Sequence, residues 1–85
     1  MSDSLHETIR AYILENYLFT DDASALGFAD SLVGRGIVDS TGMLEIILFV
    51  EERFDLKVKD EEMISENFDS VGRIAEFVKA RQRSA

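Results

Sequence analysis

The sequence contains no cysteine, no proline and no tryptophan. Because cysteine is absent, disulfide bonds and thiolate metal sites are excluded, and any thiol chemistry must come from a group added to the chain. Long hydrophobic runs are also missing, since the longest uninterrupted apolar segment covers residues 46–50. A membrane-spanning helix needs about 20 apolar residues, so we expect no membrane insertion.

Basic residues are scarce. The chain has nine Lys and Arg against 17 Asp and Glu, which gives a formal net charge of −8. Nucleic-acid binding depends on basic side chains that neutralise phosphates, so we expect no nucleic-acid partner. Protein partners with basic surfaces are the better complement, although solubility alone also explains such a charge. The first ten residues include no apolar targeting segment, and we therefore expect a cytoplasmic protein.

The length and the periodicity of apolar residues favour one small helical unit. We expect the 85 residues to form a single domain, 1–85, and a monomer. The pattern predicts an all-α fold, a small four-helix bundle with three longer helices and one short helix. A long loop, residues 19–38, is expected between the first two helices, because that segment has no sustained period.

The first helix is predicted from Leu5 to Leu18, because a core stripe of Leu5, Ile9, Ile13 and Tyr17 recurs there every four positions. Ser4 and Glu7 have the spacing of a capping box, which would start this helix. Four apolar residues of the following loop are expected to anchor it to the core: Phe28, Leu32, Ile37 and Val38.

The remaining helices follow in the second half of the chain. The second helix is predicted from Thr41 to Phe54, and the last from Val71 to Ala80, capped by Ser70 or Asp69. The short helix is expected from Asp60 to Ile64, with Asp60 as its N-cap. The apolar stripe of the second helix comprises Met43, Ile47, Val50 and Phe54, widened by Leu44 and Ile46.

The dipeptide Asp39-Ser40 precedes the second helix. Both residues are good N-caps and only one is needed, so Asp39 can cap the helix while the hydroxyl of Ser40, in the first turn, stays available. A phosphate ester on Ser40 would lie near the positive pole of the helix. Ser40 is therefore interpreted as an attachment point, with an ordinary helix cap as the simpler alternative.

A catalytic role for Ser40 has little support. A hydrolytic serine needs a base within hydrogen-bond reach, but the only histidine, His6, belongs to another predicted helix, where we expect it to face solvent. The surrounding sequence also lacks the glycine pattern of a nucleophile elbow. We therefore expect no enzyme activity and no catalytic residues. The acidic clusters at residues 51–52 and 60–62 are interpreted as solvated faces, and no metal site is expected.

A second stripe of the same helix begins next to Ser40. It is formed by Thr41, Glu45, Leu48 and Glu52, with Glu51 at its flank. The simpler interpretation is a solvated helix face with one stray leucine. The functional interpretation is a docking strip, where a basic partner pairs with the carboxylates and packs on Leu48.

With these residues in place, the chain resembles the acyl carrier protein family, which includes peptidyl and D-alanyl carriers. The resemblance covers nearly the whole chain. The residues that carry it are Asp39-Ser40, Glu45, the Glu51-Glu52-Arg53-Phe54 run, Phe28 with Asp30 to Leu32, and Val71, Ile74 and Phe77-Val78.

This resemblance implies that Ser40 carries 4'-phosphopantetheine, attached from coenzyme A by a phosphopantetheinyl transferase. The thiol of that group would hold acyl or aminoacyl cargo as thioesters for loading and transferring enzymes with basic docking surfaces. It also implies that the bundle shelters the cargo near Met43, Ile47 and Phe54. The implied partner contacts are Asp39, Thr41, Glu45, Leu48, Glu51 and Glu52.

Three positions depart from the pattern of housekeeping fatty-acid carriers: Ile37 replaces a glycine, Thr41 a leucine and Gly42 an acid. The resulting form is more similar to specialised carriers, including aminoacyl and D-alanyl ones. Gly42 is expected to permit close approach of a partner or of the prosthetic arm. The alternative function is an unmodified acidic module that binds basic proteins through the same helix.

Overall fold

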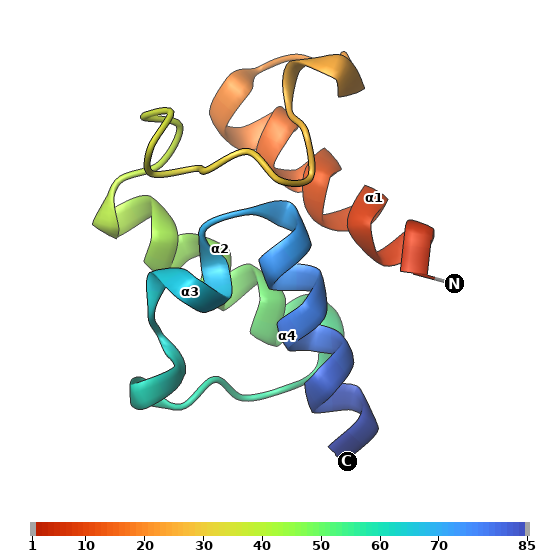
Figure 1. Cartoon of the computed structure of the whole chain (residues 1–85), viewed down its shortest axis with the longest axis vertical. Coiled ribbons are helices and arrows are strands. Elements are labelled where there is room, and N and C mark those ends of the chain that lie inside the picture. Colours follow the sequence, from red (N-terminus) through yellow and green to blue (C-terminus); the bar gives the residue numbers. More distant parts are fainter. Residues whose placement is uncertain (1, 85) are drawn as a thin grey trace.

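The computed structural model describes residues 2–84, and the side chains of residues 5–82. The described chain consists of helices joined by loops and contains no strand, which confirms the predicted all-α bundle. In Figure 1 the long loop crosses from the end of the first helical segment to the start of α2, while α4 runs from the middle of the view down toward the end marked C. The elements are α1 (Ser2–Ile13), η1 (Leu14–Leu18), η2 (Ala23–Ala25), α2 (Ser40–Phe54), η3 (Asp60–Glu62), α3 (Ser65–Phe68) and α4 (Val71–Ser84). No described helix is long and apolar enough to cross a membrane.

The core lies where the apolar stripes of α1, α2 and α4 meet. α1 packs against α4, and the four-residue helix α3 packs against the start of α4. The loop contributes Leu26, Leu32 and Val38 to the hydrophobic core, so it is packed into the bundle and does not merely cross its surface. The two residues that were predicted to widen the apolar stripe of α2 differ in burial: Ile46 is fully buried, whereas Leu44 is 53% exposed. The fully buried residues of the long helices include Ile9, Ile13, Ile46, Val50, Val71, Ile74, Ala75 and Val78.

The first helical segment begins earlier than predicted, and it ends at the predicted residue in a different helical form. α1 already starts at Ser2, so Ser4 lies inside the helix and does not act as the N-cap of a capping box. The carboxylate of Glu7 pairs instead with Arg10, one turn later, at 3.0 Å. The helical segment does reach Leu18, but its last five residues form a π-helical turn, which ends at Phe19 in the left-handed conformation.

The short helix is misplaced in the prediction. Residues 60–62 form a single 3₁₀ turn whose N-cap is Lys59, so Asp60 lies within the turn. The α-helical turn follows at Ser65–Phe68, where it buries Phe68 completely. The N-cap of α3, Ile64, has no side chain that can accept a hydrogen bond, which explains why no capping signal marks this helix in the sequence.

The long loop is fixed to the junction between α3 and α4. The carboxylate of Asp69 accepts hydrogen bonds from the hydroxyl of Ser31 (2.7 Å) and the N–H of Val33 (3.0 Å), and its carbonyl accepts one from the N–H of Leu32 (2.6 Å). Of the two predicted caps of α4, Ser70 is therefore the one used, accepting the N–H of Arg73 at 3.1 Å. These bonds hold the segment that leads into α2.

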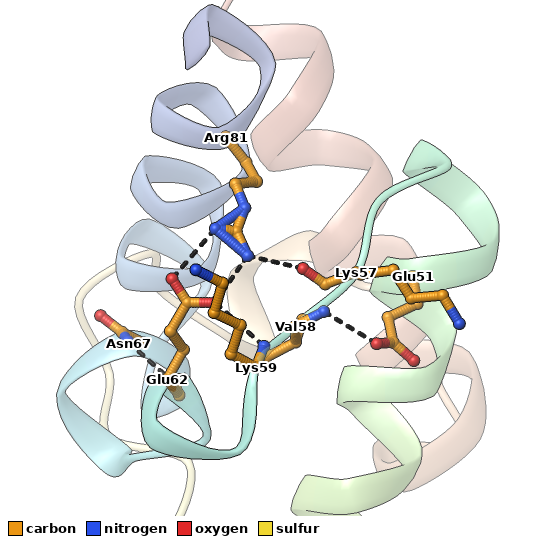
Figure 2. A network of polar contacts seen from close by, with 7 residues as sticks. All are labelled: Glu51, Lys57, Val58, Lys59, Glu62, Asn67 and Arg81. Carbon is orange, nitrogen blue, oxygen red and sulfur yellow. Dashed lines mark hydrogen bonds and ion pairs between the residues drawn. The ribbon is translucent and has the colours of Figure 1, made fainter. Parts of the chain in front are cut away.

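A polar network joins the end of α4 to the segment before α3. Figure 2 shows Arg81 reaching the carboxylate of Glu62 through both terminal nitrogens, at 2.6 and 3.0 Å, and the carbonyl of Lys57 at 2.7 Å. The same Glu62 carboxylate accepts the N–H of Lys59 at 3.0 Å. On the α2 side, the carboxylate of Glu51 accepts the N–H of Val58 at 2.8 Å.

Candidate functional site

The start of α2 presents Ser40 to solvent. The side chain of Asp39 accepts a hydrogen bond from the N–H of Gly42 at 2.8 Å, so Asp39 is the N-cap, as the sequence indicated. Ser40 is the first helical residue, one position before the predicted start at Thr41. Ser40 is exposed, and its hydroxyl has no hydrogen-bond partner among the described side chains and backbone groups. The geometry leaves this oxygen accessible beside the free N–H groups of a fifteen-residue helix.

The cap of Asp39 makes a testable contribution to stability. We expect Asp39→Ala to lower the free energy of unfolding by about 1 kcal/mol, because an N–H of the first turn of α2 loses its acceptor. Asp39→Asn, which retains a cap oxygen, should stay within a few tenths of a kcal/mol of the wild type. Urea unfolding followed by circular dichroism measures both variants, and an Asp39→Ala protein as stable as the wild type would contradict the capping role.

An apolar groove of about 430 Å³ adjoins Ser40. It lies between the first half of α2 and the segment that connects η3 to α3. Met43 and Ile47, which the resemblance places near the cargo, are in its lining, but Phe54 is not and packs against Phe49 near the other end of α2. The lining residues are Val33, Ser40, Met43, Leu44, Ile47, Met63, Ile64 and Ser65. This groove gives an apolar group tethered at Ser40 a place beside the bundle.

The predicted docking strip lies on the exposed face of α2. Thr41, Glu45 and Glu52 are exposed, and Leu48 is 57% exposed. Leu44, expected in the core, joins this face and adds a second apolar residue to it. The surface is therefore acidic and partly apolar, which suits a basic partner with an apolar contact.

Two of the carboxylates on this helix have internal partners. Glu51 is half-buried, and its carboxylate holds the N–H of Val58. Glu45 accepts a hydrogen bond at 2.6 Å from the hydroxyl of Tyr17, a residue that the sequence indicated only as part of a core stripe. Burial and the hydrogen bond to Glu45 raise the pKa of Tyr17 above its usual range, so the phenol stays protonated and donates.

Two further expectations at the site need correction. Gly42 is buried, and a Cβ there would lie 3.1 Å from that of Val38 and 3.4 Å from the ring of Tyr17, so its small size serves internal packing instead of a partner. His6 does not face solvent freely: it is half-buried, with its ring 4.8 Å from that of Phe28.

Within the described residues, no group of three or more acidic or histidine side chains is placed to hold a metal ion.

The start of α2 thus combines an exposed serine, an adjoining apolar groove and an acidic helix face. No protein-family model matches the chain. Curated proteins do: the D-alanyl carrier protein of Streptococcus uberis is 33% identical over 79 residues, covering 91% of this chain and 99% of that protein. The D-alanyl carrier protein of Streptococcus sanguinis is 32% identical over 82% of this chain and 90% of its own length. An acyl carrier protein of Clostridium acetobutylicum is 34% identical over 69% of this chain and 74% of its own.

The chain therefore belongs to the acyl carrier protein family. Its role is that of a carrier protein and not of an enzyme.

Proposed function

We propose that Ser40 carries 4'-phosphopantetheine and that the protein presents acyl or aminoacyl groups to partner enzymes. When attached, the group supplies the thiol that the cysteine-free chain lacks, and this thiol holds cargo as a thioester. The observation that carries the proposal is the geometry of Ser40: its hydroxyl is exposed because Asp39 provides the cap. Membership of the carrier family supports the same assignment.

Attachment requires a phosphopantetheinyl transferase and coenzyme A. The Ser40 oxygen forms a new bond to the phosphorus that bears the pantetheine, the pyrophosphate bond of coenzyme A breaks, and adenosine 3',5'-bisphosphate leaves. The serine proton goes to the transferase or to solvent. The resulting phosphodiester is negatively charged, and the N-terminus of α2 favours a negative charge by about 0.3–1 kcal/mol at an exposed position.

The groove beside Ser40 and the exposed face of α2 serve different parts of this function. The apolar lining at Met43 and Ile47 would shelter an apolar part of the arm or cargo. The proposed partner contacts are Asp39, Thr41, Glu45, Leu48, Glu51 and Glu52, which basic loading and transferring enzymes would meet. D-Alanine is one proposed cargo, because two of the relatives are named D-alanyl carrier proteins. A monomeric state and a cytoplasmic location stay predictions from the sequence.

The proposal is tested by intact mass. Incubation with coenzyme A and a phosphopantetheinyl transferase should add one phosphopantetheine to the wild-type protein and none to Ser40→Ala. The structure offers a matched control in Ser65, which is also exposed, also the first residue of a helix, and lines the same groove. Ser65→Ala should therefore be modified like the wild type.

Two outcomes would overturn the assignment. One is a wild-type protein that stays unmodified while the same transferase modifies another carrier in a parallel reaction. The other is a Ser40→Ala protein that still gains the group. The first outcome, combined with binding of basic proteins that depends on Glu45 and Glu52, would favour the unmodified interaction module instead.

A further inference from the structure

The hydroxyl of Tyr17 lies between two acceptors on the first turns of α2. It donates to the carboxylate of Glu45 at 2.6 Å and lies 3.3 Å from the carbonyl oxygen of Gly42. Tyr17 and Glu45 are 28 positions apart in the sequence, and the contact joins η1 to the helix that begins with Ser40. This is the tertiary contact that fixes a carboxylate on the exposed face of α2.

Local features of both elements make this contact possible. η1 is a π-helical turn, which displaces its side chains from the positions that an uninterrupted α-helix would give them. On α2, Gly42 has no side chain, and the ring of Tyr17 passes 3.4 Å from the point where a Cβ would be. The ring of Tyr12 meets that of Tyr17 edge-on at 6.2 Å and supports it from α1.

The contact orients the carboxylate of Glu45 without neutralising it. A phenol is an uncharged donor, and the raised pKa of Tyr17 keeps its proton in place. One oxygen of the Glu45 carboxylate therefore remains for an external donor, while the side chain loses rotational freedom before any partner arrives. Glu51 is less available to a partner than Glu45, because Glu51 is half-buried and its carboxylate accepts a hydrogen bond from a backbone N–H.

We propose that Tyr17 is a positioning residue for partner docking: it fixes the Glu45 carboxylate in the orientation in which a basic side chain of the phosphopantetheinyl transferase meets it. The inference rests on the proposed function of Ser40. Glu45 lies five positions after Ser40, about 7.5 Å further along the helix axis, so both residues fall within the area that one partner protein covers. Preorganisation of a contact lowers the entropy cost of binding, and its loss should appear in KM.

The test compares steady-state modification of the wild type with that of Tyr17→Phe, which keeps the ring and removes only the hydroxyl. We expect Tyr17→Phe to raise KM for the carrier about three- to tenfold, the range of one net hydrogen bond, and to leave kcat unchanged. Glu45→Gln should raise KM by at least as much. Glu76→Gln is the matched charge control: it removes one negative charge from the exposed face of α4 and should leave KM unchanged.

The double variant separates positioning from general structure. If Tyr17 acts through Glu45, Tyr17→Phe should have little further effect on KM in the Glu45→Gln background. A Tyr17→Phe protein with the wild-type KM would overturn the inference. The inference would also be overturned if Tyr17→Phe raised KM by the same factor in the wild-type and the Glu45→Gln backgrounds. Either result leaves modification of Ser40 intact, since all variants are also scored by intact mass, so it is distinguishable from failure of the proposed function.

Discussion

Phe68→Ala should remove a large share of the protein's free energy of unfolding. Phe68 is completely buried, and its ring lies 5.1 Å from that of Phe77 on α4. Replacing a buried phenylalanine by alanine costs about 3–5 kcal/mol. The per-residue range of native stability gives a domain of this size only about 4–13 kcal/mol in total. We expect the midpoint of urea unfolding, followed by circular dichroism, to fall in proportion to this loss. If the wild-type stability lies near the lower end of the range, the variant should show no native baseline.

The matched control is the exposed aromatic residue Phe19. It is 82% exposed and adopts the left-handed conformation, with a φ of 53°. Because glycine has no steric penalty in that conformation, Phe19→Gly should be as stable as the wild type or up to about 1 kcal/mol more stable. A Phe68→Ala protein within 1 kcal/mol of the wild type would show that α3 does not hold the core together.

This contrast also marks the limit of prediction from the sequence. Helices α1, α2 and α4 were recognised because each has several turns of apolar periodicity. α3 has only four residues and no capping side chain, so its position depends on burial of Phe68 against α4, a long-range contact without a local signal. The π-helical turn was missed for a related reason: the four-residue spacing that ends at Tyr17 fits an uninterrupted α-helix equally well.

At the candidate site, the local features were predictable and the tertiary ones were not. The cap by Asp39 and the exposure of Ser40 follow from helix-start chemistry, which operates within three residues. The acidic face of α2 was also visible as a stripe. The partner of Glu45 was not, because Tyr17 is distant in sequence and its spacing marked it as a core residue. Leu44 was assigned to the core for the same reason, since a widened stripe does not reveal where the core ends.

Arg81→Ala should be the second most damaging substitution, at about 1–3 kcal/mol of unfolding free energy. Arg81 and Glu62 are only 24% and 25% exposed, and the guanidinium donates to both carboxylate oxygens and to the carbonyl of Lys57. Its removal leaves a half-buried carboxylate without its cation, which costs more than the loss of an exposed ion pair. Arg81→Lys should be intermediate, because an ammonium cannot reproduce the planar fork.

Lys79 provides the control on the same helix. Its ammonium is 3.9 Å from the carboxylate of Glu76, which is 69% exposed, so Lys79→Ala should cost less than about 1 kcal/mol. The double variant Arg81→Met with Glu62→Gln should lose less than the sum of its single substitutions, because neither partner is then left as an uncompensated charge. Equal losses for Arg81→Ala and Lys79→Ala would contradict this account.

The Arg81 contact also connects stability to the groove beside Ser40. Glu62 is followed directly by Met63, Ile64 and Ser65, which form one wall of that groove. We therefore expect amide hydrogen exchange in Arg81→Ala to accelerate more in residues 59–68 than in α1, because local opening requires only the contacts that hold that segment. Uniform acceleration along the chain would instead show that Arg81 stabilises the bundle as a whole. The groove wall would then be held by the burial of Phe68 and not by the polar network.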